Sequence, residues 1–219
     1  MSKRFLLILA ALVVLFGGFL FFSKNKQTAN APGGNNGSSQ VSNHTQGDGK
    51  KGVTLIEYGD YQCPACGAYF PVLLQVQQKY GNDITFQFRN FPLVQIHQNA
   101  MAAARAAEAA DKQGKFWQMH DTLYQQQKSW ESAGNASVIM EDFATQLGLN
   151  VDKFKQDFNS SAIADTINAD TKAAQAIGAT GTPTFVLNGK KLDSLPERSL
   201  EAFSKLVDAA ISQASSKRQ

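Results

Sequence analysis

The sequence predicts an α/β domain that is interrupted by an all-helical insertion and preceded by one membrane-spanning helix. Three observations lead to this class. Strand-like sequence followed by a helix-compatible run occupies residues 53–80, alanine-rich helical sequence fills residues 99–176, and strand-like sequence returns at residues 184–192. Strand-like sequence therefore lies on both sides of a helical block.

The first part of the domain is expected at residues 52–92. Val53–Tyr58 is β-branched and apolar, as in a strand that is buried on both faces. The run from Cys63 to about Tyr80 is compatible with a helix, and a turn at residues 81–83 leads into a second strand at residues 84–89. This part is predicted to be a strand, a helix and a second strand, in that order.

An all-helical insertion is expected at residues 93–177. Turns at Gly114, Gly134 and Gly148 divide it into several helices. Two sets of residues recur at helical spacing, and each set marks a core-facing stripe: Phe116, His120, Leu123 and Tyr124 in one helix, and Ile139, Phe143 and Leu147 in the next.

The second part of the domain is expected at residues 178–215, followed by a short tail at 216–219. Thr184–Leu187 is predicted to be a strand, and an Asn188-Gly189 turn leads into a short strand at residues 190–192. An amphipathic helix from Pro196 to about Ala214 closes the domain, with these side chains facing inward: Leu200, Phe203, Leu206, Val207 and Ile211.

Residues 1–27 are predicted to anchor the chain in a membrane. Phe5–Phe22 comprises eighteen uncharged, almost wholly apolar residues and follows the basic pair Lys3 and Arg4. A helix of this length spans roughly 27 Å, near the lower limit for crossing a bilayer. A cleaved signal peptide is the alternative. We expect an uncleaved single-pass anchor in the cell membrane, with the catalytic domain on the extracytoplasmic side.

Residues 28–51 are predicted to form a flexible linker. Asn, Gly, Ser, Gln and Thr dominate this stretch, which has almost no apolar residue to fold around. His44 is accordingly expected to be a solvated linker residue. A linker of this length and composition has a reach of roughly 25–30 Å, enough for the domain to meet partners at a membrane surface.

The motif Cys63-Pro64-Ala65-Cys66 contains the only two cysteines of the chain. Because it lies at a strand-to-helix junction, Cys63 is expected to cap the helix, with Pro64 at the first helical position. Backbone N–H groups and the dipole at a helix start stabilise a thiolate, and in such motifs the pKa of the first thiol falls from about 8.5 to roughly 3.5–7. Cys66, one turn later, would be the sheltered thiol, so the pair can exchange two electrons.

Three other interpretations of the cysteine pair compete with redox chemistry. A structural disulfide would close a very short loop and would constrain the unfolded chain little. A zinc site needs four ligands, and the histidines His44, His97 and His120 have no paired spacing. His97 is expected to be a packing or capping residue and His120 a core residue. Two redox-inert buried cysteines are rare at this spacing, so we expect a redox-active disulfide and neither a metal nor another cofactor.

Four segments between Val53 and Ala214 form an ordered set of motifs: Glu57–Cys66, Phe91-Pro92-Leu93, Phe116–His120 and Gly181–Phe185. Together they resemble the DsbA-type thiol-disulfide oxidoreductases of the thioredoxin superfamily, including their membrane-anchored, BdbD-like members. In that family they would be the active-site stretch, the start of the insertion, an insertion helix and a cis-proline loop. The resemblance implies a thioredoxin fold with a helical insertion, and the activity of a protein disulfide oxidoreductase.

The resemblance also implies roles for residues outside the thiol pair. Pro183 would be cis and face the disulfide, and Thr182 would be presented to an extended substrate peptide; an ordinary trans loop is the alternative. Glu57 would be a buried acid beneath the second thiol that accepts and returns a proton; a solvent-facing strand glutamate is the alternative. Ala65 stands where the best-known oxidases carry histidine, which predicts a milder oxidant. Asp60 is expected to shape the active-site loop.

The function implied is donation of the Cys63–Cys66 disulfide to folding secreted or surface proteins. A DsbB-like or VKOR-like membrane protein would reoxidise the pair. A reductase or isomerase kept reduced by a transmembrane electron carrier is the first alternative, and a non-catalytic tethered chaperone or peptide-binding module is the second. The formal net charge of +3, from 21 basic and 18 acidic residues, indicates no nucleic-acid partner.

Overall fold

The computed structural model describes residues 40–216. The predicted anchor at residues 1–27 lies outside this range. No helix among the described residues is both long and apolar enough to cross a membrane. The described residues form one unit, and the account below is confined to it.

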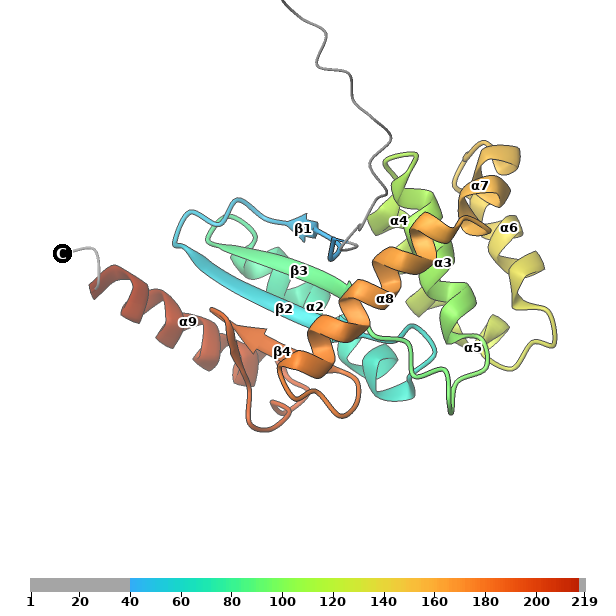
Figure 1. Cartoon of the computed structure of the whole chain (residues 1–219). Coiled ribbons are helices and arrows are strands. Elements are labelled where there is room, and N and C mark those ends of the chain that lie inside the picture. The colour runs from blue at the N-terminus through green and yellow to red at the C-terminus, as the bar shows by residue number, and fades with distance from the viewer. Residues whose placement is uncertain (1–39, 217–219) are drawn as a thin grey trace, which may run out of the picture. The chain divides into compact units, whose positions relative to one another are not determined.

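Among the described residues, one five-stranded sheet with the strand order β1-β3-β2-β4-β5 forms the centre of the domain (Figure 1). β2 and β3 are parallel, whereas β1, β4 and β5 each pair antiparallel with a neighbour. The predicted strands are present, and the tight turn between the last two has positive φ at both Asn188 and Gly189, as an Asn-Gly hairpin turn requires. The strand bounds are β1 His44–Gln46, β2 Val53–Gly59, β3 Ile84–Asn90, β4 Thr184–Leu187 and β5 Lys190–Lys191.

Helices cover both faces of the sheet. α2 (Pro64–Tyr80) and α9 (Leu200–Ser216) pack together over the face that carries Val53 and Leu55 of β2. The opposite face, which carries Tyr58, is covered by the end of α8. α9 begins four residues later than the predicted Pro196, because the Ser199 hydroxyl accepts a hydrogen bond from the Ala202 N–H and so caps the helix there.

The inserted helices lie at one end of the sheet, and α8 leads back from them to β4 (Figure 1). Gly114 and Gly148, two of the predicted turns, have positive φ and follow α3 and α6. The block between β3 and β4 agrees with the predicted order of elements. Its helices are α3 Ala100–Asp111, α4 Phe116–Gln125, α5 Gln127–Trp130, α6 Ala136–Gln146, α7 Val151–Phe158 and α8 Ser161–Ala176.

The segment before β2 corrects the prediction that a flexible linker extends to residue 51. β1 pairs with β3, and both Ser42 and His44 are buried. Two residues further along are held as well: the Asp48 N–H donates to the Gly81 carbonyl at 2.7 Å, and the Lys51 N–H donates to the Asp83 carbonyl at 2.8 Å. The described part of the expected linker is therefore packed against the domain.

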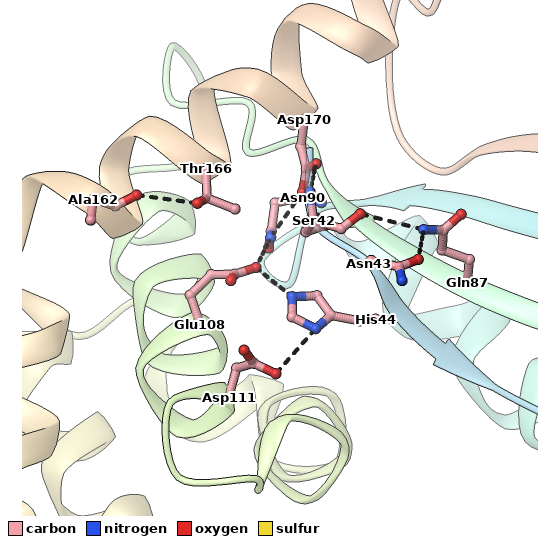
Figure 2. Close-up of polar contacts among 10 residues, drawn as sticks. All are labelled: Ser42, Asn43, His44, Gln87, Asn90, Glu108, Asp111, Ala162, Thr166 and Asp170. Carbon is pink, nitrogen blue, oxygen red and sulfur yellow. Dashed lines mark hydrogen bonds and ion pairs between the residues drawn. The ribbon is translucent and has the colours of Figure 1, made fainter. Parts of the chain in front are cut away.

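His44 is a buried, charged residue and not a solvated one (Figure 2). Its Nε2 lies 2.8 Å from Glu108 Oε1, its Nδ1 lies 3.4 Å from Asp111 Oδ1, and its ring stacks on Phe116. Burial alone lowers the pKa of His44, but the hydrogen bonds to Asp111 and Glu108 outweigh it and raise the pKa to about 9. Polar partners in the insertion therefore hold this segment. A polar composition predicted a flexible linker here, but the polar side chains are paired with buried groups instead of with water.

Candidate active site

The active site lies where β2 and β3 end. These strands are parallel and in register from Val53 opposite Ile84 to Gly59 opposite Asn90, so their carboxyl ends meet at one edge of the sheet. From Gly59 a short loop leads into α2, with Cys63 at the N-cap in an extended conformation and Pro64 as the first helical residue. The predicted placement of the cysteine motif at a strand-to-helix junction is confirmed.

The loop before β4 lies across from the first cysteine. The Thr182–Pro183 peptide bond is cis, as the resemblance implied. Cys63 Sγ lies 3.3 Å from the Thr182 carbonyl oxygen, to which the protonated thiol can donate a hydrogen bond. Pro183 is buried and Thr182 is half-buried, whereas Pro64 on the facing helix is exposed. An open pocket of about 270 Å³ adjoins this loop and is lined by residues 178–185 and 191–195.

The two thiols have opposite acidities. Neither is disulfide-bonded in this structure; Cys63 retains 7% exposure and Cys66 none. A hydrogen bond from the Cys66 thiol lowers the pKa of Cys63, and burial opposes this effect. The Thr182 side chain and the N–H groups of Cys66 and Ala65 lower the pKa further, so that it reaches about 5. Burial raises the pKa of Cys66, and the nearby charges of Glu57 and Cys63 raise it further. At neutral pH the reduced pair therefore holds one thiolate and one thiol.

Glu57 lies on β2 beneath the thiol pair and is 1% exposed. Burial raises the pKa of its carboxyl group to about 8, and the negative charge of Cys63 contributes to the shift. A solvent-facing glutamate is therefore excluded. A carboxyl group with this pKa can exchange protons near neutral pH, which is the chemistry that the buried thiol of Cys66 requires.

Asp60 fixes the loop that presents the thiols. Its Oδ1 accepts a hydrogen bond from the Gln62 N–H at 2.8 Å, and its Oδ2 accepts one from the Leu93 N–H at 2.9 Å. His97 Nδ1 lies 2.7 Å from the same Oδ2, and the Asp60 carbonyl accepts the Cys63 N–H at 3.0 Å. Asp60 therefore shapes the loop as predicted. His97, predicted to be a packing or capping residue, instead contacts the Asp60 carboxylate and so helps to hold the same loop.

Gln127, at the start of α5, is a site residue that the sequence patterns did not reveal. Its Nε2 donates to the carbonyl oxygens of Tyr61 at 2.7 Å and Cys63 at 3.0 Å. A Cβ on Gly67 would lie 2.6 Å from Gln127 Oε1, so glycine at this position lets α2 approach the insertion. No local signal indicates this contact, because the bonded residues are 64 and 66 positions apart.

Comparison with known proteins identifies relatives of the chain. The profile of the family described as "Thioredoxin" matches residues 39–209. The oxidised BdbD structure from Bacillus subtilis is 23% identical, covers 80% of this chain and 97% of its own, and gives a TM-score of 0.67. The alpha-DsbA1 structure from Wolbachia pipientis is 24% identical, covers 82% of this chain and 96% of its own, and gives a TM-score of 0.69.

A curated relative is much longer than this chain. The Na(+)/H(+) antiporter NhaA 1 of Mycobacterium sp. (strain KMS) is 35% identical over 150 residues, which are 68% of this chain and 24% of the antiporter. The chain thus spans about a quarter of the length of this relative.

The site combines a cysteine pair at a helix start with a facing cis-proline loop and a buried acid. This combination is typical of thioredoxin-fold proteins with a redox-active cysteine pair. The chain belongs to the thioredoxin family, and its fold is similar to those of the BdbD and alpha-DsbA1 structures.

Proposed function

We propose that this protein donates its Cys63–Cys66 disulfide to folding secreted or surface proteins on the extracytoplasmic side of a membrane. The observation that carries the proposal is the opposite acidity of the two thiols on one helical turn. The low pKa of Cys63 and the raised pKa of Cys66 favour a reduced pair with one stable thiolate. Stabilising the reduced form is what makes a disulfide an oxidant.

The proposed reaction transfers two electrons from substrate to protein. A substrate thiolate attacks Cys63 Sγ, the Cys63–Cys66 bond breaks, and Cys66 leaves as a thiolate that takes up a proton. A second substrate thiolate then attacks the substrate sulfur of the mixed disulfide, and Cys63 leaves as a stable thiolate. The products at neutral pH are a substrate disulfide, the Cys63 thiolate, the Cys66 thiol and one proton released to solvent.

The cis-proline loop is the proposed substrate contact. Thr182 is half-buried beside Cys63, and the adjoining pocket is lined by this loop and by residues 191–195. An extended peptide can pair with exposed backbone at such a place, as in strand addition. We further propose a DsbB-like or VKOR-like membrane protein as the reoxidant. We propose no ion transport, since the chain spans only about a quarter of the antiporter relative.

The test traps the cysteines in intact cells with acid, labels free thiols with a mass-tagging alkylator, and reads the redox state of the pair on a gel. A disulfide donor is expected to be mostly oxidised, with Cys63→Ser abolishing turnover and Cys66→Ser accumulating mixed disulfides with substrates. A mostly reduced pair would overturn the proposed direction and indicate a reductase or isomerase. A double cysteine variant that still complemented a deletion would instead indicate a chaperone.

A further inference from the structure

Four buried polar atoms behind the thiol pair have no hydrogen-bond partner among the residues that the structure describes. They are Glu57 Oε1, Tyr61 OH, Tyr124 OH and His120 Nε2. The side chains are almost fully buried, with residue exposures of 1%, 1%, 6% and 2% in that order. Buried polar groups are nearly always hydrogen-bonded, so four such atoms in one core require an explanation.

The three rings lie together in the core. The ring centroids of Tyr61 and Tyr124 are 5.0 Å apart, and His120 lies 5.6 Å from Tyr61 and 5.1 Å from Tyr124. Tyr124 and His120 belong to α4 of the insertion, whereas Tyr61 belongs to the active-site loop. The cluster therefore bridges the insertion and the redox site.

Glu57 shares this region of the core. Side chains two residues apart on a strand project from the same face, so Glu57 and Gly59 of β2 face the same side. A Cβ at Gly59 would lie 2.9 Å from Tyr124 OH. The Tyr124 hydroxyl therefore lies over the face of β2 from which the Glu57 carboxyl group projects.

The hydrogen-bonding capacities of the four atoms are complementary. His120 Nδ1 lies 3.0 Å from Asp121 Oδ1, and an ionised carboxylate only accepts hydrogen bonds, so Nδ1 carries the proton. Burial lowers the pKa of His120, which leaves a neutral ring with Nε2 as a bare acceptor in the core. The two tyrosine hydroxyls can each donate and accept. Asp121 is 38% exposed and reaches solvent.

We propose that Glu57, the Tyr61 and Tyr124 hydroxyls and His120, joined by bound water, form a proton path between the Cys66 thiol and solvent at Asp121. A buried water needs room as well as several polar partners, and the four unpartnered polar atoms of this cluster would supply the partners. The path rests on the proposed disulfide exchange, because that reaction adds a proton to Cys66 in one half of its cycle and removes it in the other.

The outward half of the cycle accompanies reoxidation. Cys63, joined to the reoxidant in a mixed disulfide, is attacked at Sγ by Cys66; the Cys63–Cys66 bond forms, the reoxidant sulfur leaves as a thiolate, and the Cys66 proton passes to Glu57. Because the pKa of Glu57 is about 8, its carboxyl group already holds a proton at pH 7 and must release it first. That proton passes through a tyrosine hydroxyl to His120 Nε2, while the Nδ1 proton leaves through Asp121.

The inward half resets the histidine. When a substrate thiolate opens the disulfide, Cys66 needs a proton; His120 then takes one at Nδ1 from Asp121 and releases the one at Nε2 inward. Each full cycle therefore returns His120 to its starting tautomer without a rotation of the buried ring.

Burial, with a smaller contribution from the surrounding charges, keeps the hydroxyls protonated. Burial raises the pKa of both Tyr61 and Tyr124, so each hydroxyl passes a proton on without remaining ionised. Titratable groups on other elements face the cluster: Cys66 of α2, Asp60 of the active-site loop, Glu108 of α3, Asp170 of α8 and His44 of β1.

The test separates the two steps of oxidation. Reduced protein is mixed with oxidised glutathione at pH 7 and quenched with acid, and mass spectrometry resolves the glutathione mixed disulfide at Cys63 from the Cys63–Cys66 disulfide. In the first step the Cys63 thiolate attacks glutathione, and Cys66 keeps its proton. In the second step Cys66 must lose its proton in order to attack Cys63 Sγ. Tyr124→Phe is expected to slow the second step by about tenfold and to leave the first within about twofold, since positioned proton transfer is worth at least that much.

A double variant distinguishes proton transfer from altered packing. Glu57→Gln and Tyr124→Phe interrupt the same path, so their double variant is expected to resolve the mixed disulfide no more slowly than the slower single variant. Tyr80→Phe is the matched control: it removes a buried hydroxyl that bonds Asp208 at the far end of α2, and neither step should change.

Two outcomes would overturn the path: second-step rates of wild-type size in Tyr124→Phe, or losses that multiply in the double variant. Failure of the proposed function gives a different result, because the pair would then be mostly reduced in intact cells, whatever the second-step rates of the variants.

Discussion

Two cysteines one helical turn apart differ in acidity because their surroundings differ. Cys63 is at the start of α2, where the Cys66 thiol and backbone N–H groups stabilise negative charge. Cys66 faces the core and the carboxyl group of Glu57, which disfavour charge. Ala65 is half-buried between them and supplies no charge of its own, so the expectation of a milder oxidant than histidine-bearing relatives stays a prediction.

Glu57 should make stability depend on pH. Its folded-state pKa of about 8 lies above the ordinary value of 4.5, so the folded state binds more protons between these limits and loses stability as pH rises from 4.5 to 8. At about 1.4 kcal/mol per pKa unit, the loss relative to Glu57→Gln should be roughly 3–5 kcal/mol. The measurement is urea unfolding of both proteins across this pH range.

The difference between the two proteins isolates Glu57, because ionisation of Cys63 contributes equally to both in the first approximation. Glu201→Gln, at a side chain that is 77% exposed, is the matched control and should shift stability by the same small amount at every pH. A pH-independent difference between wild type and Glu57→Gln would contradict the raised pKa.

At the scale of elements, polar contacts join segments that are far apart in the sequence. His44 of β1 contacts Glu108 and Asp111 of α3, and Ser42 just before β1 donates its N–H to Asp170 Oδ1 of α8 (Figure 2). The His44 ring also stacks on Phe116 of α4. The active-site loop is likewise held by Gln127 of α5. The insertion therefore supports both the N-terminal strand and the redox motif.

Removal of His44 should destabilise the domain. In His44→Leu the carboxylate of Glu108 stays buried without its ion-pair partner, which costs about 3–5 kcal/mol. The pKa of His44 is raised to about 9, so its contribution is fully present below about pH 6.5 and is lost as pH rises through 9. Denaturant unfolding at pH 6 and pH 9.5 should therefore show a smaller difference from wild type at the higher pH.

A double variant, His44→Leu with Glu108→Leu, should recover part of the lost stability, because no buried charge is left unpaired. Lys205→Ala is the control: its partner Glu201 and Lys205 itself are both mostly exposed, and a loss of no more than about 1 kcal/mol is expected. Equal losses in His44→Leu and Lys205→Ala would show that the buried pair is not what holds β1.

At the scale of the whole molecule, the site forms where the sheet edge, α2 and the insertion meet (Figure 1). The carboxyl ends of β2 and β3 supply the loop, the cis-proline loop before β4 supplies the facing wall, and α4 and α5 supply Tyr124 and Gln127. The site is therefore built from segments that come together only in the folded domain.

At the scale of the whole molecule, the predicted anchor can be tested by cell fractionation. The full chain should sediment with membranes and resist extraction by carbonate, because eighteen apolar residues at Phe5–Phe22 are long enough to span a bilayer. A variant that lacks residues 1–27 should appear in the soluble fraction and still react with oxidised glutathione.

Intact-mass analysis of the membrane fraction identifies the N-terminus. A chain that retains residues 1–27 agrees with an uncleaved anchor, whereas a shorter soluble chain would indicate a cleaved signal peptide. A full-length soluble protein would contradict both interpretations.

Sequence alone predicted strands at residues 53–58, 84–89 and 184–187, the helix that starts at Cys63, and the helical block between the strands. The structure extends the first two strands by one residue each and agrees with the rest. Periodicity and helix-start chemistry are local, so a short window contains their cause. The family motifs added the cis bond at Pro183 and the buried acid at Glu57, both of which the structure contains.

Only the tertiary structure decided how polar residues are partnered. Gln127 and Cys63 are 64 positions apart, as are His44 and Glu108, and Ser42 and Asp170 are 128 apart. A polar side chain is expected to be solvated unless its partner is known, and no local window contains these partners. The packed segment before β2 and the cluster behind Cys66 could therefore be recognised only once the chain had folded.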